Sequence, residues 1–204
     1  MKRAAGGLPP SKARTPAVRI GAGRWKGRLL EVPQGARPTS SRAREALFDI
    51  LQERVAGSRV LELYAGSGAV GLEALSRGAA RSVLVEPSAS ALERNLGRLA
   101  PEAGTFELLC REAAAAVSEL LRRGERFDIV FADPPYASGL SPDVAPGVAR
   151  LLAEGGTFVL QGDVGRDPLP AGLTLADRRA YGRNVLRFFE ADRGAATASS
   201  LARF

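Results

Sequence analysis

The sequence of 204 residues predicts an α/β fold in which a mostly parallel sheet is covered by helices on both faces. From Ser58 onward, short apolar segments alternate with helical segments, a pattern typical of parallel strands joined by crossover helices. A glycine-rich segment stands where the first of these strands meets its helix. The last two apolar segments, 173–181 and 184–191, are separated only by Gly182 and Arg183, which predicts a terminal antiparallel hairpin.

The elements before this alternation predict a small basic N-terminal extension. Residues 1–17 are expected to be a flexible basic arm, because Gly, Pro, Lys and Arg dominate and apolar periodicity is absent. Within 18–55, two short strands are expected around residues 21–23. A helix follows, which the hydroxyl residues at 39–41 can cap and whose apolar residues recur at helical spacing. One face of this helix is therefore expected to pack against the main sheet.

Residues 56–192 are expected to form the main domain, and residues 193–204 a frayed tail. Besides the terminal hairpin, strands are expected at 60–64, 82–86, 105–109, 127–132 and 156–161, and helices at 69–77, 88–99, 112–123 and 143–153. The sheet should then contain five parallel strands extended by the hairpin.

Positive charge is concentrated in the first quarter of the chain. The whole chain has 29 Lys+Arg, 22 Asp+Glu and a net charge of +7. Residues 1–54 hold 12 basic and 4 acidic residues, whereas residues 55–204 hold 17 and 18. Such asymmetry is typical of a segment that contacts a polyanion, although a solvated basic surface would look the same.

The composition excludes several classes of chemistry. The chain has no histidine, which excludes a Ser-His-Asp triad, a His-activated cysteine and His-bearing zinc or iron sites. The single cysteine, Cys110, excludes an internal disulfide and a four-thiolate cluster, and we expect no metal. The longest uncharged segment, 63–72, is about half the roughly 20 residues that span a bilayer. Without an apolar signal segment, we expect a cytoplasmic protein with no membrane contact.

Residues 62–68, Glu-Leu-Tyr-Ala-Gly-Ser-Gly, join the first strand of the sheet to its helix. Glycines there let the backbone approach a ligand, and the helix N-terminus offers free N–H groups. Gly66, Gly68 and Gly71 match the dinucleotide-binding pattern, which a plain tight turn would also satisfy. Glu86 ends the next strand, where a carboxylate can accept both hydroxyls of a ribose. The pair predicts a cofactor that contains a nucleoside.

Asp133, Pro134, Pro135 and Tyr136 follow the fourth strand, at the edge where open α/β sheets bind ligands. The two prolines remove two backbone donors, so the turn presents carbonyl oxygens and a carboxylate. These acceptors suit the two hydrogens of an exocyclic amine, and Tyr136 can stack on the base. A simple chain reversal is the alternative, but the position opposite the glycine-rich turn favours a site.

Together these motifs resemble the class I S-adenosylmethionine-dependent amino-methyltransferases. Segments 19–28 and 37–48 narrow the resemblance to the bacterial 16S ribosomal RNA guanine-N2 methyltransferases. It continues through 68–79 to 179–182 and covers roughly residues 18–190. It implies a Rossmann-like fold with a mostly parallel seven-stranded sheet, and methyl transfer from S-adenosylmethionine to N2 of a guanine in small-subunit RNA. The expected partner is this RNA, free or in an assembling particle, and the expected state is a monomer.

The resemblance also implies roles for particular residues. Glu62 and the 66–68 backbone would hold the methionine end of the cofactor, and Glu86 the ribose. The full cofactor set is Glu62, Tyr64, Ala65, Gly66, Ser67, Gly68, Glu86, Pro87, Glu112 and Ala113. The catalytic set is Asp133, Pro134, Pro135 and Tyr136, whereas Gln161, at the end of the fifth strand, is given no role. The expected RNA phosphate contacts are Arg19, Arg24, Lys26, Arg28, Arg42 and Arg44.

Three other functions remain open from the sequence. A methyltransferase acting on adenine N6 or cytosine N4, in DNA or another RNA, would use the same Asp-Pro-Pro-Tyr turn. A dinucleotide oxidoreductase would explain the three glycines but not residues 133–136. A non-catalytic RNA-binding module would explain only the basic extension.

Overall fold

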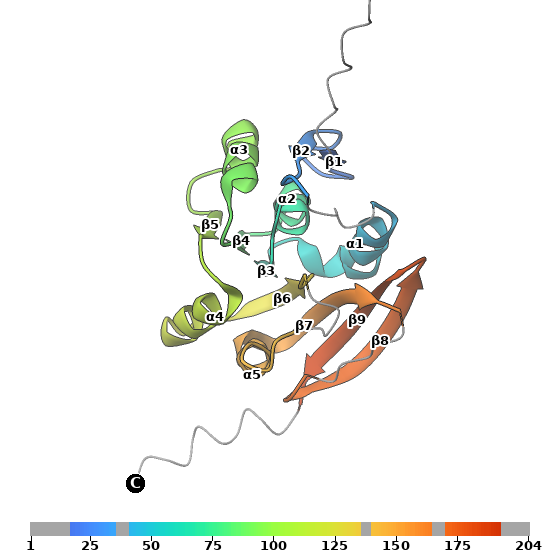
Figure 1. Cartoon of the computed structure of the whole chain (residues 1–204). Helices are drawn as coiled ribbons and strands as arrows, with labels where there is room; N and C mark the ends of the chain where they lie inside the picture. The colour runs from blue at the N-terminus through green and yellow to red at the C-terminus, as the bar shows by residue number, and fades with distance from the viewer. Residues whose placement is uncertain (1–16, 36–40, 136–139, 165–169, 193–204) are drawn as a thin grey trace, which may run out of the picture.

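The computed structural model describes residues 17–35, 41–135, 140–164 and 170–192. Within these ranges the chain forms a small two-stranded sheet, a seven-stranded sheet and five helices (Figure 1). The expected basic arm and frayed tail lie outside the described residues, except for Ala17. No helix in the described part of the chain is long and apolar enough to cross a membrane.

The seven-stranded sheet has the order β5-β4-β3-β6-β7-β9-β8. Its strands are β3 (Arg59–Leu63), β4 (Arg81–Val85), β5 (Phe106–Leu109), β6 (Phe127–Ala132), β7 (Leu152–Asp163), β8 (Leu173–Tyr181) and β9 (Asn184–Ala191). The first five in the chain pair in parallel, whereas β9 is antiparallel to both β7 and β8. The predicted fold class, with its terminal hairpin, is confirmed.

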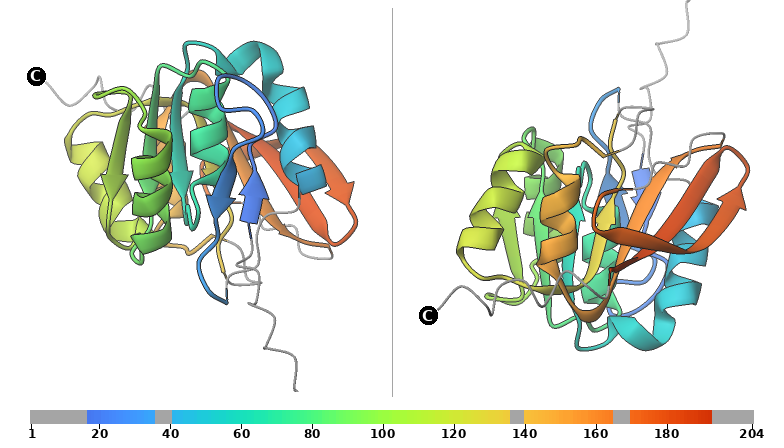
Figure 2. Two further views of the ribbon diagram at one scale, coloured as in Figure 1. Left: turned by 90° about the horizontal axis from the view of Figure 1, so that it is seen from above. Right: turned by 90° about the horizontal axis from the view of Figure 1, so that it is seen from below.

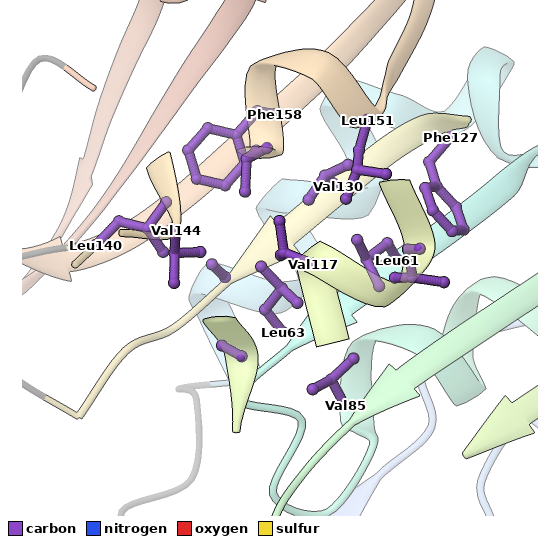
Figure 3. Packing of buried hydrophobic residues seen from close by; sticks show 14 of the residues in the cluster. Leu61, Leu63, Val85, Val117, Phe127, Val130, Leu140, Val144, Leu151 and Phe158 are labelled. Atoms are coloured by element: carbon purple, nitrogen blue, oxygen red, sulfur yellow. The ribbon is translucent and has the colours of Figure 1, made fainter. Parts of the chain in front are cut away.

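Helices cover both faces of this sheet (Figure 1). The helices are α1 (Ser41–Val55), α2 (Ala69–Ser76), α3 (Ser90–Leu99), α4 (Ala113–Arg122) and α5 (Ala145–Leu151). Helices α4 and α5 pack on one face together with Leu61 and Leu63 (Figure 3). Helices α1 and α2 pack on the other face with Val60, and α3 packs there beside α2. Because side chains alternate along a strand, the apolar run of β3 supplies both layers.

The junction of α5 and β7 differs from the prediction. We expected a helix over 143–153 and a strand over 156–161, whereas α5 ends at Leu151 and β7 begins at Leu152. Leu152 has extended backbone angles and pairs with Phe127 of β6. Pairing with the neighbouring strand therefore overrides the helical pattern of the local sequence, which cannot show where a partner strand begins.

The N-terminal strands β1 (Ala17–Arg19) and β2 (Leu29–Glu31) form the separate two-stranded sheet, which lies beside α2 and α3 (Figure 2). The amide N–H of Arg24 donates to the Ser76 carbonyl at 2.8 Å. Gly23 has φ +80°, and a Cβ there would lie 1.8 Å from the same carbonyl oxygen. Only glycine permits this close approach, which seats the hairpin loop on the end of α2.

Candidate active site

The candidate site lies where the chain reverses direction across the sheet. Strands β4 and β5 follow β3 in the chain and lie on one side of it, whereas the next strand, β6, lies on the other side of β3. The carboxyl ends of these parallel strands share one edge, and open α/β sheets bind ligands at such a switch point. The glycine-rich turn, Glu86 and Asp133 follow β3, β4 and β6 respectively. The topology thus brings the two predicted motifs to neighbouring strand ends.

The three glycines of the dinucleotide-like pattern, two in the turn and Gly71 in α2, are required for different structural reasons. Gly66 has φ +54°, and an added Cβ would meet no atom within 4 Å. At Gly68, with φ +74°, a Cβ would lie 2.4 Å from Cδ1 of Leu92. At Gly71 it would lie 2.5 Å from Cδ2 of Leu84. Gly68 and Gly71 therefore permit tight packing, whereas Gly66 borders open space in which a ligand can approach the backbone.

The residues beside these glycines are held from within the protein. Tyr64 has φ 59°, a left-handed conformation that costs a non-glycine residue about 1–3 kcal/mol and tends to occur at functional sites. The buried Ala65 donates its N–H to the Val85 carbonyl at 2.9 Å. The carbonyl of buried Ser67 accepts a bond from Asn95 at 2.9 Å. The turn therefore has a defined shape without a ligand.

Glu62 supports the turn from behind. Its side chain is 3% exposed, and its carboxylate accepts hydrogen bonds from the N–H groups of Val70 at 3.2 Å and Gly71 at 2.8 Å. The expectation that Glu62 holds the methionine end of the cofactor is corrected accordingly. The carboxylate is enclosed and bonded to the start of α2, so it positions the glycine-rich turn. Burial raises the pKa of Glu62 to about 8, with an added upward effect from Asp133.

This pKa predicts a pH-dependent stability. Because the folded state holds a proton on Glu62 between the ordinary pKa of 4.5 and about 8, the free energy of unfolding should fall as pH rises through this window. Glu62→Gln keeps an acceptor for Gly71 and should flatten that fall. Urea denaturation of both proteins at intervals from pH 5 to 8.5 measures the difference. An equal slope in the two proteins would show that Glu62 does not titrate in this window.

Glu86 faces the turn from the end of β4. Its Oε2 accepts the N–H of Gly66 at 2.9 Å and its Oε1 the N–H of Ser88 at 3.1 Å. The residue is half-buried, so its carboxylate is held in place and still reaches solvent. A partly accessible carboxylate beside the open space at Gly66 fits the ribose hydroxyls of a nucleoside-containing cofactor.

Three further residues expected to bind the cofactor differ in exposure. Pro87 is exposed after Glu86, and Glu112 is exposed at the start of α4, beyond the edge strand β5. Ala113 is 4% exposed and packs in the core with α4. Because its side chain is buried, Ala113 can offer a ligand only its backbone.

Asp133 is half-buried at the end of β6, next to the half-buried Pro134 and the exposed Pro135. Tyr136 lies outside the described residues. The carboxylate Oδ2 of Asp133 accepts a 2.6 Å hydrogen bond from Nε2 of Gln161. Sequence reasoning gave Gln161 no role. The usable signal was its place at the end of the strand expected at 156–161, since parallel strands of one sheet end at the same edge.

The basic residues of the N-terminal unit divide into a surface group and one buried member. Five exposed basic residues within 18–55 form the surface group: Arg19, Arg24, Lys26, Arg28 and Arg42. Arg44 is 3% exposed, and its guanidinium donates to Glu73 at 2.9 Å and to the Arg19 carbonyl at 2.6 Å. The expectation that Arg44 contacts RNA phosphate is wrong, because a side chain enclosed between α1 and α2 cannot reach a polyanion.

Asn95 of α3 is a further residue that sequence reasoning missed. It is fully buried, and its Nδ2 donates to the carbonyls of Glu31 and Ser67, both at 2.9 Å. Its Oδ1 accepts the N–H of Glu31 at 2.8 Å. One amide therefore ties the N-terminal hairpin to the glycine-rich turn. The surface group and the candidate cofactor site are thus parts of one packed structure.

The switch-point site and the sheet order define a class I methyltransferase fold. The chain belongs to the family described as conserved hypothetical protein 95, whose model matches residues 18–190. A curated relative, "Ribosomal RNA small subunit methyltransferase D" of Escherichia coli strain K12, is 33% identical over 188 residues. That alignment covers 89% of this chain and 93% of the relative.

Solved structures of other proteins share this fold. A hypothetical protein from Thermus thermophilus is 38% identical, with a TM-score of 0.74 over 85% of this chain and 99% of its own. The more distant SMU.776, solved as a complex with SAH, is 13% identical, with a TM-score of 0.64 over 92% of this chain and 58% of its own. At that identity SMU.776 supports the fold alone.

Proposed function

We propose that this protein is an S-adenosylmethionine-dependent methyltransferase that modifies the exocyclic N2 of a guanine in 16S ribosomal RNA. The observation that carries the proposal is the placement of Asp133 on the strand next to the glycine-rich turn, at one sheet edge. The name of the Escherichia coli relative supports small-subunit ribosomal RNA as the substrate. The resemblance of segments 19–28 and 37–48 supports the choice of guanine N2.

The cofactor would lie between Gly66 and Glu86. The open space at Gly66 admits its methionine portion close to the backbone, and the accessible carboxylate of Glu86 suits its ribose. Pro87 and Glu112, beyond Glu86 and at the start of α4, are proposed to border its adenine. When bound, this cofactor supplies an electrophilic methyl group on a sulfonium.

Asp133 and the Pro134 carbonyl are proposed to orient the substrate amine. Two acceptors can bind its two hydrogens and direct the nitrogen lone pair, which is otherwise conjugated with the ring, toward the methyl group. The amine proton is lost after transfer, when the nitrogen has become acidic, so histidine is not required. Such positioning is worth about 7–11 kcal/mol when the geometry is correct. The target base must leave its stack to reach this edge.

The surface group, Arg19, Arg24, Lys26, Arg28 and Arg42, is proposed to contact RNA phosphates. The Arg24 guanidinium lies 4.0 Å from the centre of the Trp25 ring, which holds it on the exposed loop. Arg28 donates to the Arg98 carbonyl at 3.1 Å, and Arg19 donates to the Gly27 carbonyl at 2.7 Å. Neither bond neutralises a charge, so both guanidinium groups stay cationic for a polyanion.

Replacing Arg24, Lys26 and Arg28 together by glutamine should weaken RNA binding and its salt dependence. Each lost phosphate contact lowers the slope of log K against log salt by about 0.7–0.9, so three should lower it by about 2–3. Filter binding of 16S rRNA across a salt series measures this slope. The matched control is Arg122→Gln with Arg126→Gln, exposed residues on and after α4. An unchanged slope in the triple variant would mean that RNA binds elsewhere.

Transfer of a labelled methyl group tests the substrate. We expect incorporation into 16S rRNA, free or in small subunits from a strain lacking the protein, and mass mapping of the digest should show N2-methylguanine. Incorporation into DNA alone, or at adenine N6 or cytosine N4, would contradict the proposal. The same digest identifies the modified guanine.

A further inference from the structure

The end of β7 places a buried amide against the Asp-Pro-Pro turn. Gln161 is 4% exposed, and its Nε2 lies 2.6 Å from Oδ2 of Asp133. Strands β6 and β7 are parallel, with Ala132 opposite Leu160. The residues that follow this pair therefore stand side by side at the sheet edge.

We infer that Gln161 is the positioning residue for Asp133, and that its amide sets the direction of the carboxylate by donating a hydrogen bond to Oδ2. The inference rests on the proposed function, in which Asp133 receives the substrate amine. An amide N–H cannot release its proton at ordinary pH, so it donates to the carboxylate without competing for charge. A hydrogen bond to the charged form of an acid stabilises that form.

The carbonyl oxygen of the Gln161 side chain shows that this amide is not explained by packing alone. Its Oε1 is buried and has no hydrogen-bond partner among the described residues. An unpaired buried acceptor is unfavourable, and an apolar side chain of similar size would avoid it. The amide is therefore accounted for by the bond that Nε2 donates to Asp133.

Ionisable side chains lie on the strands and helices packed near the Asp133–Gln161 hydrogen bond. Glu62 on β3 lies near enough to interact electrostatically with Asp133, and the charge of Arg44 on α1 also acts on Glu62. Arg187 of β9 is buried opposite Leu160, so it lies on the other face of the sheet from Gln161, where it donates to the Asp163 carbonyl at 3.0 Å. Because Glu62 keeps its proton up to about pH 8, the amide of Gln161, and not the charge of Glu62, orients the Asp133 carboxylate.

Two variants of Gln161 test the inference in the methyl-transfer assay with labelled S-adenosylmethionine and 16S rRNA. Gln161→Leu removes the donor at similar volume, and kcat should fall about 10- to 100-fold, as when a partner that orients a functional group is lost. KM for RNA and the Kd for S-adenosylmethionine should stay within a few-fold.

Gln161→Glu supplies a donor only while it is protonated. Its kcat should therefore stay near the wild-type value at the acidic end of the pH range. As the added carboxyl ionises beside Asp133, kcat should fall, which gives the pH–rate profile an alkaline limb absent from the wild type. A role in folding alone would lower the melting temperature without creating this limb.

Asp133→Ala, assayed in parallel, separates the two hypotheses. If Asp133→Ala turns over normally, the role of Asp133 in the proposed function fails. If Asp133→Ala is inactive but Gln161→Leu keeps full kcat, only the inference about Gln161 is overturned. If Gln161→Leu does not fold, the pH–rate profile of Gln161→Glu decides, since a wild-type profile would overturn the inference.

Discussion

Asp133→Ala should reduce methyl transfer by at least about 10²–10³-fold, the loss expected when an acceptor or donor aimed at the reacting group is removed. The reason is geometric, because the amine loses the carboxylate that holds it with its lone pair toward the methyl group. Affinity for S-adenosylmethionine should stay within several-fold, since the proposed cofactor contacts follow β3 and β4. Single-turnover transfer to 16S rRNA and calorimetric cofactor binding measure the two quantities.

The matched control for this variant is Asp163→Ala. Asp163 is an exposed carboxylate at the end of β7, two residues beyond Gln161. The Asp163→Ala substitution removes one negative charge from the same sheet edge but keeps the carboxylate of Asp133. The rate of methyl transfer should therefore be nearly unchanged. Unimpaired turnover by Asp133→Ala would refute the role proposed for Asp133.

Glu73→Leu should destabilise the fold by about 3–5 kcal/mol, the usual effect of leaving a buried charge without its partner. Glu73 is 1% exposed and accepts from Arg44 at 2.9 Å and from Arg77 at 2.7 Å. Its loss leaves the enclosed guanidinium of Arg44 uncompensated between α1 and α2. Urea denaturation followed by circular dichroism measures the change in the free energy of unfolding.

The double variant Arg44→Met with Glu73→Leu is the control for charge. Because the double variant lacks both members of the buried pair, no guanidinium at position 44 is left without a partner. The double variant should therefore be more stable than Glu73→Leu alone. The single variant Arg44→Met also tests whether the enclosed Arg44 side chain contacts RNA. A loss of RNA affinity in Arg44→Met at unchanged stability would return Arg44 to the phosphate contacts.

Most of the fold followed from patterns that are local in the chain. The central strands β3, β4 and β6 each had an apolar segment near the observed limits, because strands buried on both faces need nearly continuous apolar residues. The clearest error, the start of β7 at Leu152, arose where pairing with Phe127 of β6 determined the conformation. Such pairing joins residues that are distant in sequence, and local propensity does not encode it.

The candidate site was predictable where a motif has its own backbone reason. Gly66 and Gly68 have positive φ, and Glu86 accepts the N–H of Gly66, so the turn and the acid were correctly associated. The functions of single charged residues were less predictable. Glu62 and Arg44 are residue types that suggest ligand contacts, yet both are enclosed and bonded within the protein.

The sequence by itself determined the class of fold, the two motifs at the carboxyl edge and the basic character of the first quarter of the chain. Each of these depends on residue type and spacing along one segment. Only the tertiary structure decided that Arg44 pairs with Glu73, that Glu62 supports α2 and that Gln161 contacts Asp133. A charge or an amide acquires its function from the burial and partners that distant segments provide, and these exist only once the layers have packed.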